Sequence, residues 1–288
     1  MIAMMQANKK ARNLAKAIIC LGFCIISVTK LSAQGDLMIF PKRIVFEDNK
    51  GIQEIQLANT GKDSALYNIT FAQYRMNDLG EFKEITEPDS GQNFASPYLR
   101  LFPRQVALSP NESQTVKVQL KKTNDMKDAE YRSHIYFRAV KSNQPLGNDG
   151  NKVDSTTISV KLVPVFGITI PCIIRKGVSN TSVSISDLEY ECIGDSTFYL
   201  KMSFNRRGNM STYGDISVQY INSESKSSEV AKVQGFAVYT PGNLRKSKVQ
   251  LKNLNGVKFI GGKFKVIYSY IGKDKPIILA EEEYVITK

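Results

Sequence analysis

Few residues in this sequence have the types and spacing that catalysis or metal binding requires. The 288 residues include one histidine, His134, within the run "SHIYFRAV". A single histidine excludes most histidine-based metal sites and weakens a Ser-His-Asp triad. The sequence also has no GxSxG, no CxxC and no phosphate-binding glycine loop. We therefore predict no enzyme, no metal and no cofactor, and we expect His134 to be a structural residue that is hydrogen-bonded or exposed.

A pair of bases inside an apolar run, "FPKRIVFE" (40–47), is the better candidate for chemistry. Bulky and β-branched residues predict a strand here, with Pro41 near its start, where a missing N–H costs least. Neighbouring residues of a strand point to opposite faces, so we expect Lys42 and Arg43 on opposite sides. An arginine on a core-facing side needs a partner, and a guanidinium is suited to grip a carboxylate with two hydrogen bonds.

The first 33 residues have the pattern of a secretory signal peptide. Bases precede the apolar run "AIICLGFCIISVT" (17–29), and "LSA" before Gln34 offers a small-residue cleavage site. Those bases are Lys9, Lys10, Arg12 and Lys16. Thirteen residues span only about 20 Å as a helix, which is short of a bilayer core, so a cleaved signal is favoured over a retained anchor. We expect an exported protein with no membrane insertion after cleavage.

Removal of this segment lowers the net charge of the protein. It carries five bases and no acid, so the net charge falls from +12 to +7. The remaining bases alternate with acids instead of clustering with aromatic residues, which indicates a solvated surface and no nucleic-acid binding. Two cysteines remain, Cys172 and Cys192. In an exported protein they either form a disulfide or stay free as thiols, and both alternatives are open at this point.

Alternating apolar and polar runs dominate the chain after residue 33. About 13 or 14 short strands, separated by turn residues, predict an all-β protein of two β-sandwiches. The polar stretch "RKGVSN" (175–180) places the boundary between an N-terminal domain, 34–175, and a C-terminal domain, 176–288. The segment 77–98 is expected to be a strand connection with an acidic loop. The segment 141–154 is expected to be a mobile loop.

An ordered set of motifs lies within 34–175 and comprises "PKRIVFED", "IQEIQLANTG", "RLFPRQVALSPNESQTVKVQL", "YRSHIYFRAV" and "VPVFGITIPCIIR". This set resembles the periplasmic pilus-assembly chaperones, the PapD-like family. The later run "FNRRGNMSTYGDISVQY" (204–220) resembles the variant of that family found in Bacteroidota. The resemblance implies two immunoglobulin-like domains in a boomerang arrangement. It also implies periplasmic localisation and exported pilus, fibre or surface subunits as partners, and it allows an outer-membrane usher as a second partner.

The resemblance further assigns roles to residues. Arg43 matches the arginine that holds a subunit's C-terminal carboxylate, with an ordinary ion pair as the alternative. Ile158, Val160 and Leu162 match the strand that such chaperones donate to a subunit. These three residues share one face of the run "TISVKLVPVFGITIPCII" (157–174), and the alternative is that they face their own core.

The family also keeps a lysine on the donated strand, and this chain departs from that pattern. Counted without gaps, the lysine position falls on Gly167, and Lys161 lies six residues earlier, roughly 20 Å along a strand. Lys42 and Arg175 are the remaining candidates for an auxiliary base.

The sequence therefore predicts a periplasmic chaperone that caps exported subunits by donor-strand complementation. The alternative is an exported immunoglobulin-like structural or adhesive component of a surface fibre. A chaperone should form soluble one-to-one complexes, whereas a fibre component should co-assemble and reach the surface.

Overall fold

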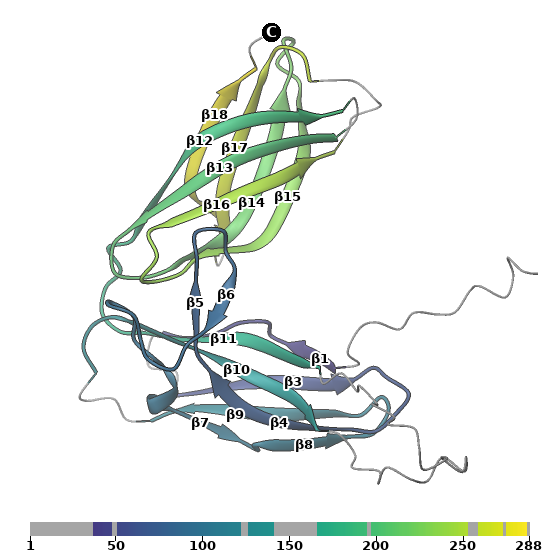
Figure 1. Ribbon diagram of the computed structural model, residues 1–288, viewed down its shortest axis with the longest axis vertical. Coiled ribbons are helices and arrows are strands. Elements are labelled where there is room, and N and C mark those ends of the chain that lie inside the picture. The colour runs from purple at the N-terminus through teal and green to yellow at the C-terminus, as the bar shows by residue number, and fades with distance from the viewer. Residues whose placement is uncertain are drawn as a thin grey trace, which may run out of the picture. The chain divides into compact units, whose positions relative to one another are not determined.

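A computed structural model describes residues 37–47, 51–121, 126–140, 166–194, 197–252, 259–272 and 275–286 (Figure 1). The expected signal peptide, the expected loop 141–154, the expected donor residues Ile158, Val160 and Leu162, and Lys161 all lie outside the described residues. In the described ranges nearly every element is a β-strand, and the one helical element is a single 3-10 turn, η1 (Ser96–Tyr98). The all-β prediction is confirmed.

The first sandwich consists of two sheets. One has the order β1-β3-β9-β7, and its strands are β1 (Leu37–Phe40), β3 (Ile52–Asn59), β9 (Ser113–Leu120) and β7 (Leu99–Phe102). The other has the order β2-β11-β10-β4-β8, and its strands are β2 (Ile44–Phe46), β11 (Gly167–Arg175), β10 (Glu130–Val140), β4 (Ala65–Ala72) and β8 (Gln105–Leu108). The sheets enclose one buried apolar cluster, to which alternate residues of their strands contribute, such as Ile55 and Leu57 of β3 and Ile135 and Phe137 of β10. This is an immunoglobulin-like sandwich.

Two strands of this sandwich change sheets partway along their length. β1 pairs with β3, and after a break of three residues β2 pairs in parallel with β11 in the other sheet. In the same way β7 pairs with β9, and β8 pairs with β4. Pro41 and Pro103 stand in the two breaks, where the absence of a backbone N–H ends one hydrogen-bond ladder.

The sequence interpretation of "FPKRIVFE" as one strand is therefore wrong. Pro41, Lys42 and Arg43 form the break between β1 and β2, so the strand rule of alternating faces does not apply to the two bases. Lys42 is exposed and Arg43 is partly buried. The sheet change sets the direction of Arg43, and sequence periodicity alone does not encode that change.

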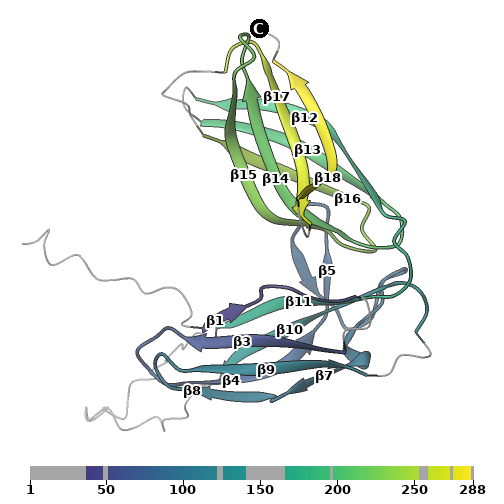
Figure 2. The same ribbon diagram turned by 180° about the vertical axis from the view of Figure 1, so that it is seen from behind.

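The second sandwich also has two sheets (Figure 2). One has the order β12-β13-β16, and its strands are β12 (Ser182–Ile193), β13 (Thr197–Arg207) and β16 (Leu244–Leu251). The other has the order β15-β14-β17-β18, and its strands are β15 (Ser227–Val238), β14 (Thr212–Ile221), β17 (Lys263–Ile271) and β18 (Pro276–Val285). Aromatic rings dominate the core. The ring centres of Phe204, Phe236 and Tyr268 lie within 6 Å of one another.

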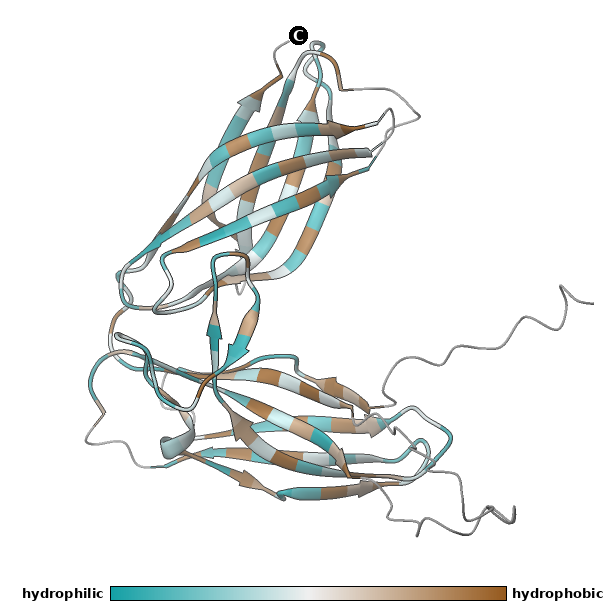
Figure 3. Ribbon diagram, viewed as in Figure 1, coloured by the Kyte–Doolittle hydropathy of each residue, from teal (hydrophilic) through white to brown (hydrophobic). Residues whose placement is uncertain are grey.

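Hydropathy follows the pleat of these strands. In Figure 3 brown and teal residues alternate along most of them, as expected where one face of a strand packs on a core and the other faces water. The prediction of two sandwiches is confirmed, because the two apolar clusters belong to separate sets of strands. The exact division at residue 175 and the boomerang arrangement stay predictions.

The segment 77–98 contains more structure than the expected acidic loop. β5 (Tyr74–Met76) and β6 (Phe82–Glu84) form a short hairpin (Figure 1). Arg75 forms an ion pair with Asp89, which closes the segment after the hairpin. The hairpin tip meets β16, where the Lys246 N–H donates to the Asp78 carbonyl at 2.6 Å. At the tip, Gly80 has a φ of +82° and lies against the Arg245 guanidinium, which explains why no side chain stands there.

Both cysteines are free thiols, so the disulfide alternative is excluded. Cys172 is buried in β11, whereas Cys192 is exposed near the end of β12. Burial raises the pKa of the Cys172 thiol well above its usual range, so this group is an inert part of the core. Among the described residues, no helix is long and apolar enough to cross a membrane.

Candidate ligand pocket around Arg43

Arg43 lines a cavity of about 670 Å³, which we call the Arg43 pocket. The strand β2 and the end of β11 supply one side of it. The start of β14, the end of β17 and part of β18 supply the other. The lining residues are Arg43, Val45, Glu47, Arg175, Ser179, Thr181, Ser211, Thr212, Tyr213, Gly214, Asp215, Tyr270, Ile271 and Leu279. Its volume is in the range of pockets that bind small molecules and peptide ends.

Two tyrosine rings hold the guanidinium of Arg43. The Arg43 Cζ atom lies 4.3 Å from the centre of the Tyr213 ring and 5.8 Å from the centre of the Tyr239 ring. Its Nη1 donates a long hydrogen bond of 3.4 Å to the Tyr239 hydroxyl. Stacking on a ring fixes the plane of a guanidinium and leaves the N–H groups at its edge able to bind other partners.

Arg43 has no acidic partner in the part of the chain that the structure describes. A guanidinium has five N–H donors, and the Tyr239 hydroxyl accepts from one of them. The predicted alternative of an ordinary ion pair therefore has no support among the described contacts. A half-buried cation of this kind favours an anionic ligand.

Arg175, predicted as an auxiliary base, lies in the same pocket, but acids neutralise its charge. Its Nε donates to the Glu130 carboxylate at 3.1 Å and its Nη1 to the Glu47 carboxylate at 2.8 Å. Its Nη2 donates to the Ser211 carbonyl at 2.9 Å. With three acceptors already bound, Arg175 shapes the wall of the pocket and has little capacity left to bind a ligand.

Glu130 is the hub behind this wall. Its side chain is fully buried, at 0% exposure. Besides Arg175, it accepts hydrogen bonds from the Ser211 N–H at 3.0 Å, from the Ser211 hydroxyl and from the Thr240 hydroxyl at 3.2 Å. A buried carboxylate needs such a complete set of donors, because an unpaired charge in the interior costs several kcal/mol.

Arg132 is a buried basic residue that the sequence analysis did not identify. Its Cζ lies 4.4 Å from the centre of the Tyr239 ring, and its Nη2 donates to the carbonyls of Thr240 at 3.2 Å and Tyr74 at 3.3 Å. Burial lowers the pKa of the Arg132 guanidinium. Tyr239 thus contacts both Arg43 and Arg132. Tyr213 and Tyr239 were also missed, because a tyrosine in an alternating strand carries no local signal of a pocket.

His134 corrects a further expectation. It is buried and packs edge to face on Tyr74, at 5.0 Å between ring centres, and on Phe82, at 5.4 Å. Its Nδ1 is buried without a hydrogen-bond partner, so it is neither exposed nor satisfied at that atom. Burial, with a smaller contribution from Arg132, lowers the pKa of His134 to about 3. The residue is structural, as predicted, but in an aromatic cluster.

The other predicted bases lie elsewhere. Lys42 is exposed and does not line the pocket. Gly167 stands at the start of β11, five residues before Cys172, which is the register partner of Ile44. Five residues of strand span roughly 16 Å, so Gly167 does not share the surroundings of Arg43. Gly167 lies instead against the Tyr136 ring, which occupies the space where a side chain would be.

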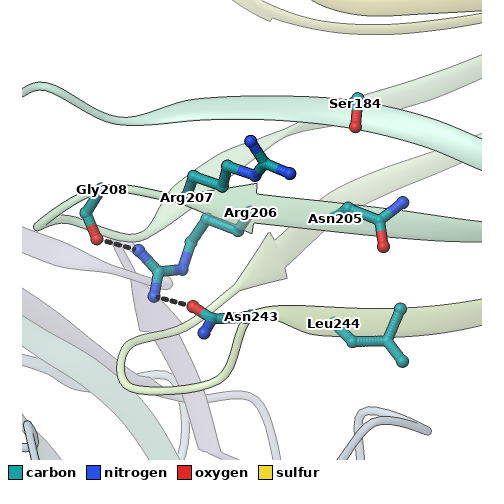
Figure 4. Close-up of a pocket in the computed structure, with 7 residues that line it drawn as sticks. All are labelled: Ser184, Asn205, Arg206, Arg207, Gly208, Asn243 and Leu244. Carbon is teal, nitrogen blue, oxygen red and sulfur yellow. Dashed lines mark hydrogen bonds between the residues drawn. The ribbon is translucent and has the colours of Figure 1, made fainter.

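A second hollow of about 690 Å³ lies on the second sandwich (Figure 4). Arg206 is its central residue, and backbone carbonyls or Asn243 already accept from all its nitrogens. Figure 4 shows its guanidinium turned toward Gly208 and Asn243, whereas Arg207 points away. Arg206 ties loops together, so we do not consider this hollow a functional site.

β11 has an open edge next to the Arg43 pocket. All nine of its residues are in register with β10, but only Cys172, Ile173 and Ile174 pair with β2. In the described chain, residues 167–171 therefore have a strand partner on one side alone. Unpaired strand edges can accept a further strand.

Comparisons with known proteins gave structural likeness only. No family model and no curated protein matches the chain. Solved structures with a similar fold include the YadV chaperone, at 12% identity and a TM-score of 0.41, with 87% of this chain and 100% of that chain covered. The CupB2 chaperone of Pseudomonas aeruginosa is 13% identical, with a TM-score of 0.39 and coverage of 86% and 98%. The structure of the Salmonella enterica SafA pilin in complex with the SafB chaperone matches at 11% identity and a TM-score of 0.40. This match covers 88% of this chain and 97% of that chain.

Proposed function

We propose that this protein is a periplasmic chaperone that binds exported pilus, fibre or surface subunits and caps them by donor-strand complementation. Arg43 would hold the C-terminal carboxylate of the subunit. The observation that carries the proposal is the guanidinium of Arg43, which lines a 670 Å³ pocket without a carboxylate partner among the described residues. Residues 1–33 would direct export and be removed.

A carboxylate is the ligand that suits this site. A guanidinium fork forms two parallel hydrogen bonds with a carboxylate, and the tyrosine rings around Arg43 hold the fork in one plane. The rings also exclude water from one face of the cation, which strengthens a charge-assisted hydrogen bond. A chain terminus supplies one carboxylate and can enter a pocket end first.

The open edge of β11 supports the second part of the proposal. An extended segment of a subunit can add to residues 167–171 by main-chain hydrogen bonds, as in β-augmentation. The predicted donor residues Ile158, Val160 and Leu162 precede this edge in the chain. The geometry thus favours a subunit that runs along β11 and ends at Arg43.

Native mass spectrometry tests the proposal. The tagged protein would be purified from its own periplasm as wild type, as Arg43→Ala and as Arg104→Ala. Arg104 is an exposed arginine that does not line the Arg43 pocket, so it is a matched control. We expect a one-to-one complex with an exported subunit in the wild type and in Arg104→Ala. Loss of one buried charge pair costs roughly 2–5 kcal/mol, so Arg43→Ala should lose most of the complex.

Two results would contradict the proposal. A clean monomer in every sample would remove the evidence for a client. A higher-order assembly that Arg43→Ala leaves unchanged would favour the alternative function, an exported structural or adhesive component of a surface fibre.

A further inference from the structure

The outer face of the sheet β1-β3-β9-β7 carries large apolar side chains that the described residues leave uncovered. Alternate residues of its strands, such as Ile55 of β3 and Val118 of β9, are buried in the core, so the residues between them point outward. Phe102 of β7 is 75% exposed, Phe40 of β1 69% and Ile52 of β3 55%. Several exposed apolar side chains on one face indicate an interaction surface.

Strand register shows that these apolar side chains share the face with bases. Phe102 stands opposite Lys117. Arg100 of β7 and Ile52 of β3 both stand opposite Gln119, one on each side of β9. Paired residues of neighbouring strands point to the same side of a sheet. Strand pairing thus gathers bases beside apolar residues, although bases and acids alternate along the sequence.

The bases surround a hollow of about 470 Å³ near the β7 edge of this face. Besides Ile52 and Phe102, its lining includes Arg100, Arg104, Lys117 and Lys121. Within the described residues, neither arginine side chain has a hydrogen-bond or ion-pair partner. Lys117 lies 3.7 Å from Glu54, which is the one acid in these four strands as described. The hollow is therefore positive and favours an anionic partner.

The chemistry of the whole face fits the surface of a bilayer that contains anionic phospholipid. Lipid phosphates can pair with bases, while exposed aromatic side chains enter the boundary between headgroups and acyl chains. Phe40 and Phe102 stand on the two edge strands, about 14 Å apart across the sheet, and the hollow includes Phe102 but not Phe40. A peptide in the hollow would leave Phe40 uncovered, whereas a flat bilayer surface can contact both rings.

We propose that the outer face of the sheet β1-β3-β9-β7 binds membranes that are rich in anionic phospholipid. Arg100 and Arg104 pair with lipid phosphates, and Phe40 and Phe102 enter the headgroup region. None of these four residues lines the Arg43 pocket, so membrane binding is separate from the capture of a subunit and does not depend on it. The positive net charge of the chain assists its approach to such a membrane.

Co-sedimentation with vesicles tests the inference on the protein purified from the periplasm. One set of vesicles is pure phosphatidylcholine, and the other contains equal parts of phosphatidylcholine and phosphatidylglycerol. We expect the protein to bind the anionic vesicles at least about tenfold more tightly, because each base near an anionic surface contributes about fivefold. Salt at about 1 M should remove most of this difference, because it shortens the Debye length to about 3 Å.

Two double variants separate the charge from the apolar contact. Arg100→Gln with Arg104→Gln should weaken binding to the anionic vesicles at least about tenfold and reduce its salt dependence. Phe40→Ser with Phe102→Ser should weaken binding by a similar factor and keep the salt dependence. All four side chains are exposed, so both variants should fold.

The controls change exposed residues of the first sandwich that lie outside this face. They are Lys83→Gln with Arg138→Gln for the charge, and Phe166→Ser for the apolar contact. Each should bind the vesicles as the wild type does. Arg43→Ala should also bind them normally, which would distinguish membrane binding from subunit capture.

Four results would overturn the inference. Equal binding to both kinds of vesicle, or no binding to the anionic kind, would show that the bases do not meet lipid phosphates. Unchanged binding in both double variants would assign the membrane contact to another surface. Displacement of the protein from vesicles by glycerol phosphate would indicate a site for a small anion. Displacement by micromolar acidic peptide would indicate a protein partner instead of a membrane.

Discussion

At the residue scale, the number of hydrogen-bond acceptors around the guanidinium separates Arg43 from Arg175 and Arg206. Glu130 and Glu47 compensate Arg175, and loop carbonyls saturate Arg206. Arg43 instead lies on two rings with most of its donors unused by the described residues. Arg175 and Arg206 are bonded at every nitrogen, whereas Arg43 lines a pocket with donors to spare, so Arg43 is the candidate for ligand binding.

His134 gives a prediction about acid stability. The folded protein keeps His134 neutral, with a pKa of about 3, whereas the unfolded chain protonates it near pH 6.5. The unfolded state therefore binds more protons between these values, and stability is lost as the pH falls through this window. Between pH 6.5 and pH 5 this residue should cost about 2 kcal/mol of unfolding free energy.

Urea unfolding at pH 7.5, 6 and 5 checks this, with wild type beside His134→Leu. His134 is the one histidine of the chain, so the difference between the two proteins isolates it. The variant should show the shallower loss of stability on acidification. Parallel pH profiles would show that His134 is protonated in the folded state.

At the element scale, the pocket depends on how closely β14 and β17 approach. Gly214 lies beside Ser269, and a Cβ added at Gly214 would overlap the Ser269 carbonyl oxygen. The neighbouring residues Tyr213 and Tyr270 line the Arg43 pocket. A glycine is thus required where the two strands bring these pocket residues together.

Gly214→Ala should destabilise the protein by about 1–3 kcal/mol, because the backbone oxygen that it meets cannot turn away as a side chain would. Gly51→Ala is the control, since an added Cβ there meets no atom within 4 Å. Thermal unfolding followed by circular dichroism would compare the two. Equal midpoints would mean that the pairing of β14 with β17 is looser than described.

At the scale of the whole molecule, Glu130 joins residues from distant parts of the chain. It lies in β10, yet its partners Ser211 and Thr240 are 81 and 110 residues further on. Ile173, Ala237 and Tyr239 form a small apolar cluster with Val45 and Met76. Polar and apolar contacts together connect strands of both sandwiches, so we expect the two to unfold cooperatively.

Glu130→Ala should cost about 3–5 kcal/mol, because it removes one partner of a buried ion pair and leaves several buried donors unsatisfied. Glu47→Ala, which removes the other acid on Arg175, should cost less than about 1 kcal/mol, since the Glu47 side chain is 48% exposed. Differential scanning calorimetry would show the loss, and a split transition in Glu130→Ala would confirm the coupling. Similar stability of both variants would contradict the role of the hub.

The sequence by itself determined the all-β class and the two sandwiches. Alternation along a strand is a local property, because a core-facing side chain recurs at every second residue. The candidate bases Arg43 and Arg175 were also visible in the sequence. The single strand expected over 40–47 was wrong, because Pro41 ends one ladder and the chain enters the other sheet, a choice that local pattern does not encode.

Only the tertiary structure decided the composition of the pocket. Arg43 meets the Tyr239 hydroxyl across 196 residues, and Arg175 meets Glu47 across 128. Sheet order and strand register bring these groups together, and neither leaves a mark at fixed spacing in the sequence. The contribution of β17 to the pocket was hidden for the same reason: Tyr270 and Ile271 continue an alternating strand, and only packing shows which of its residues remain uncovered.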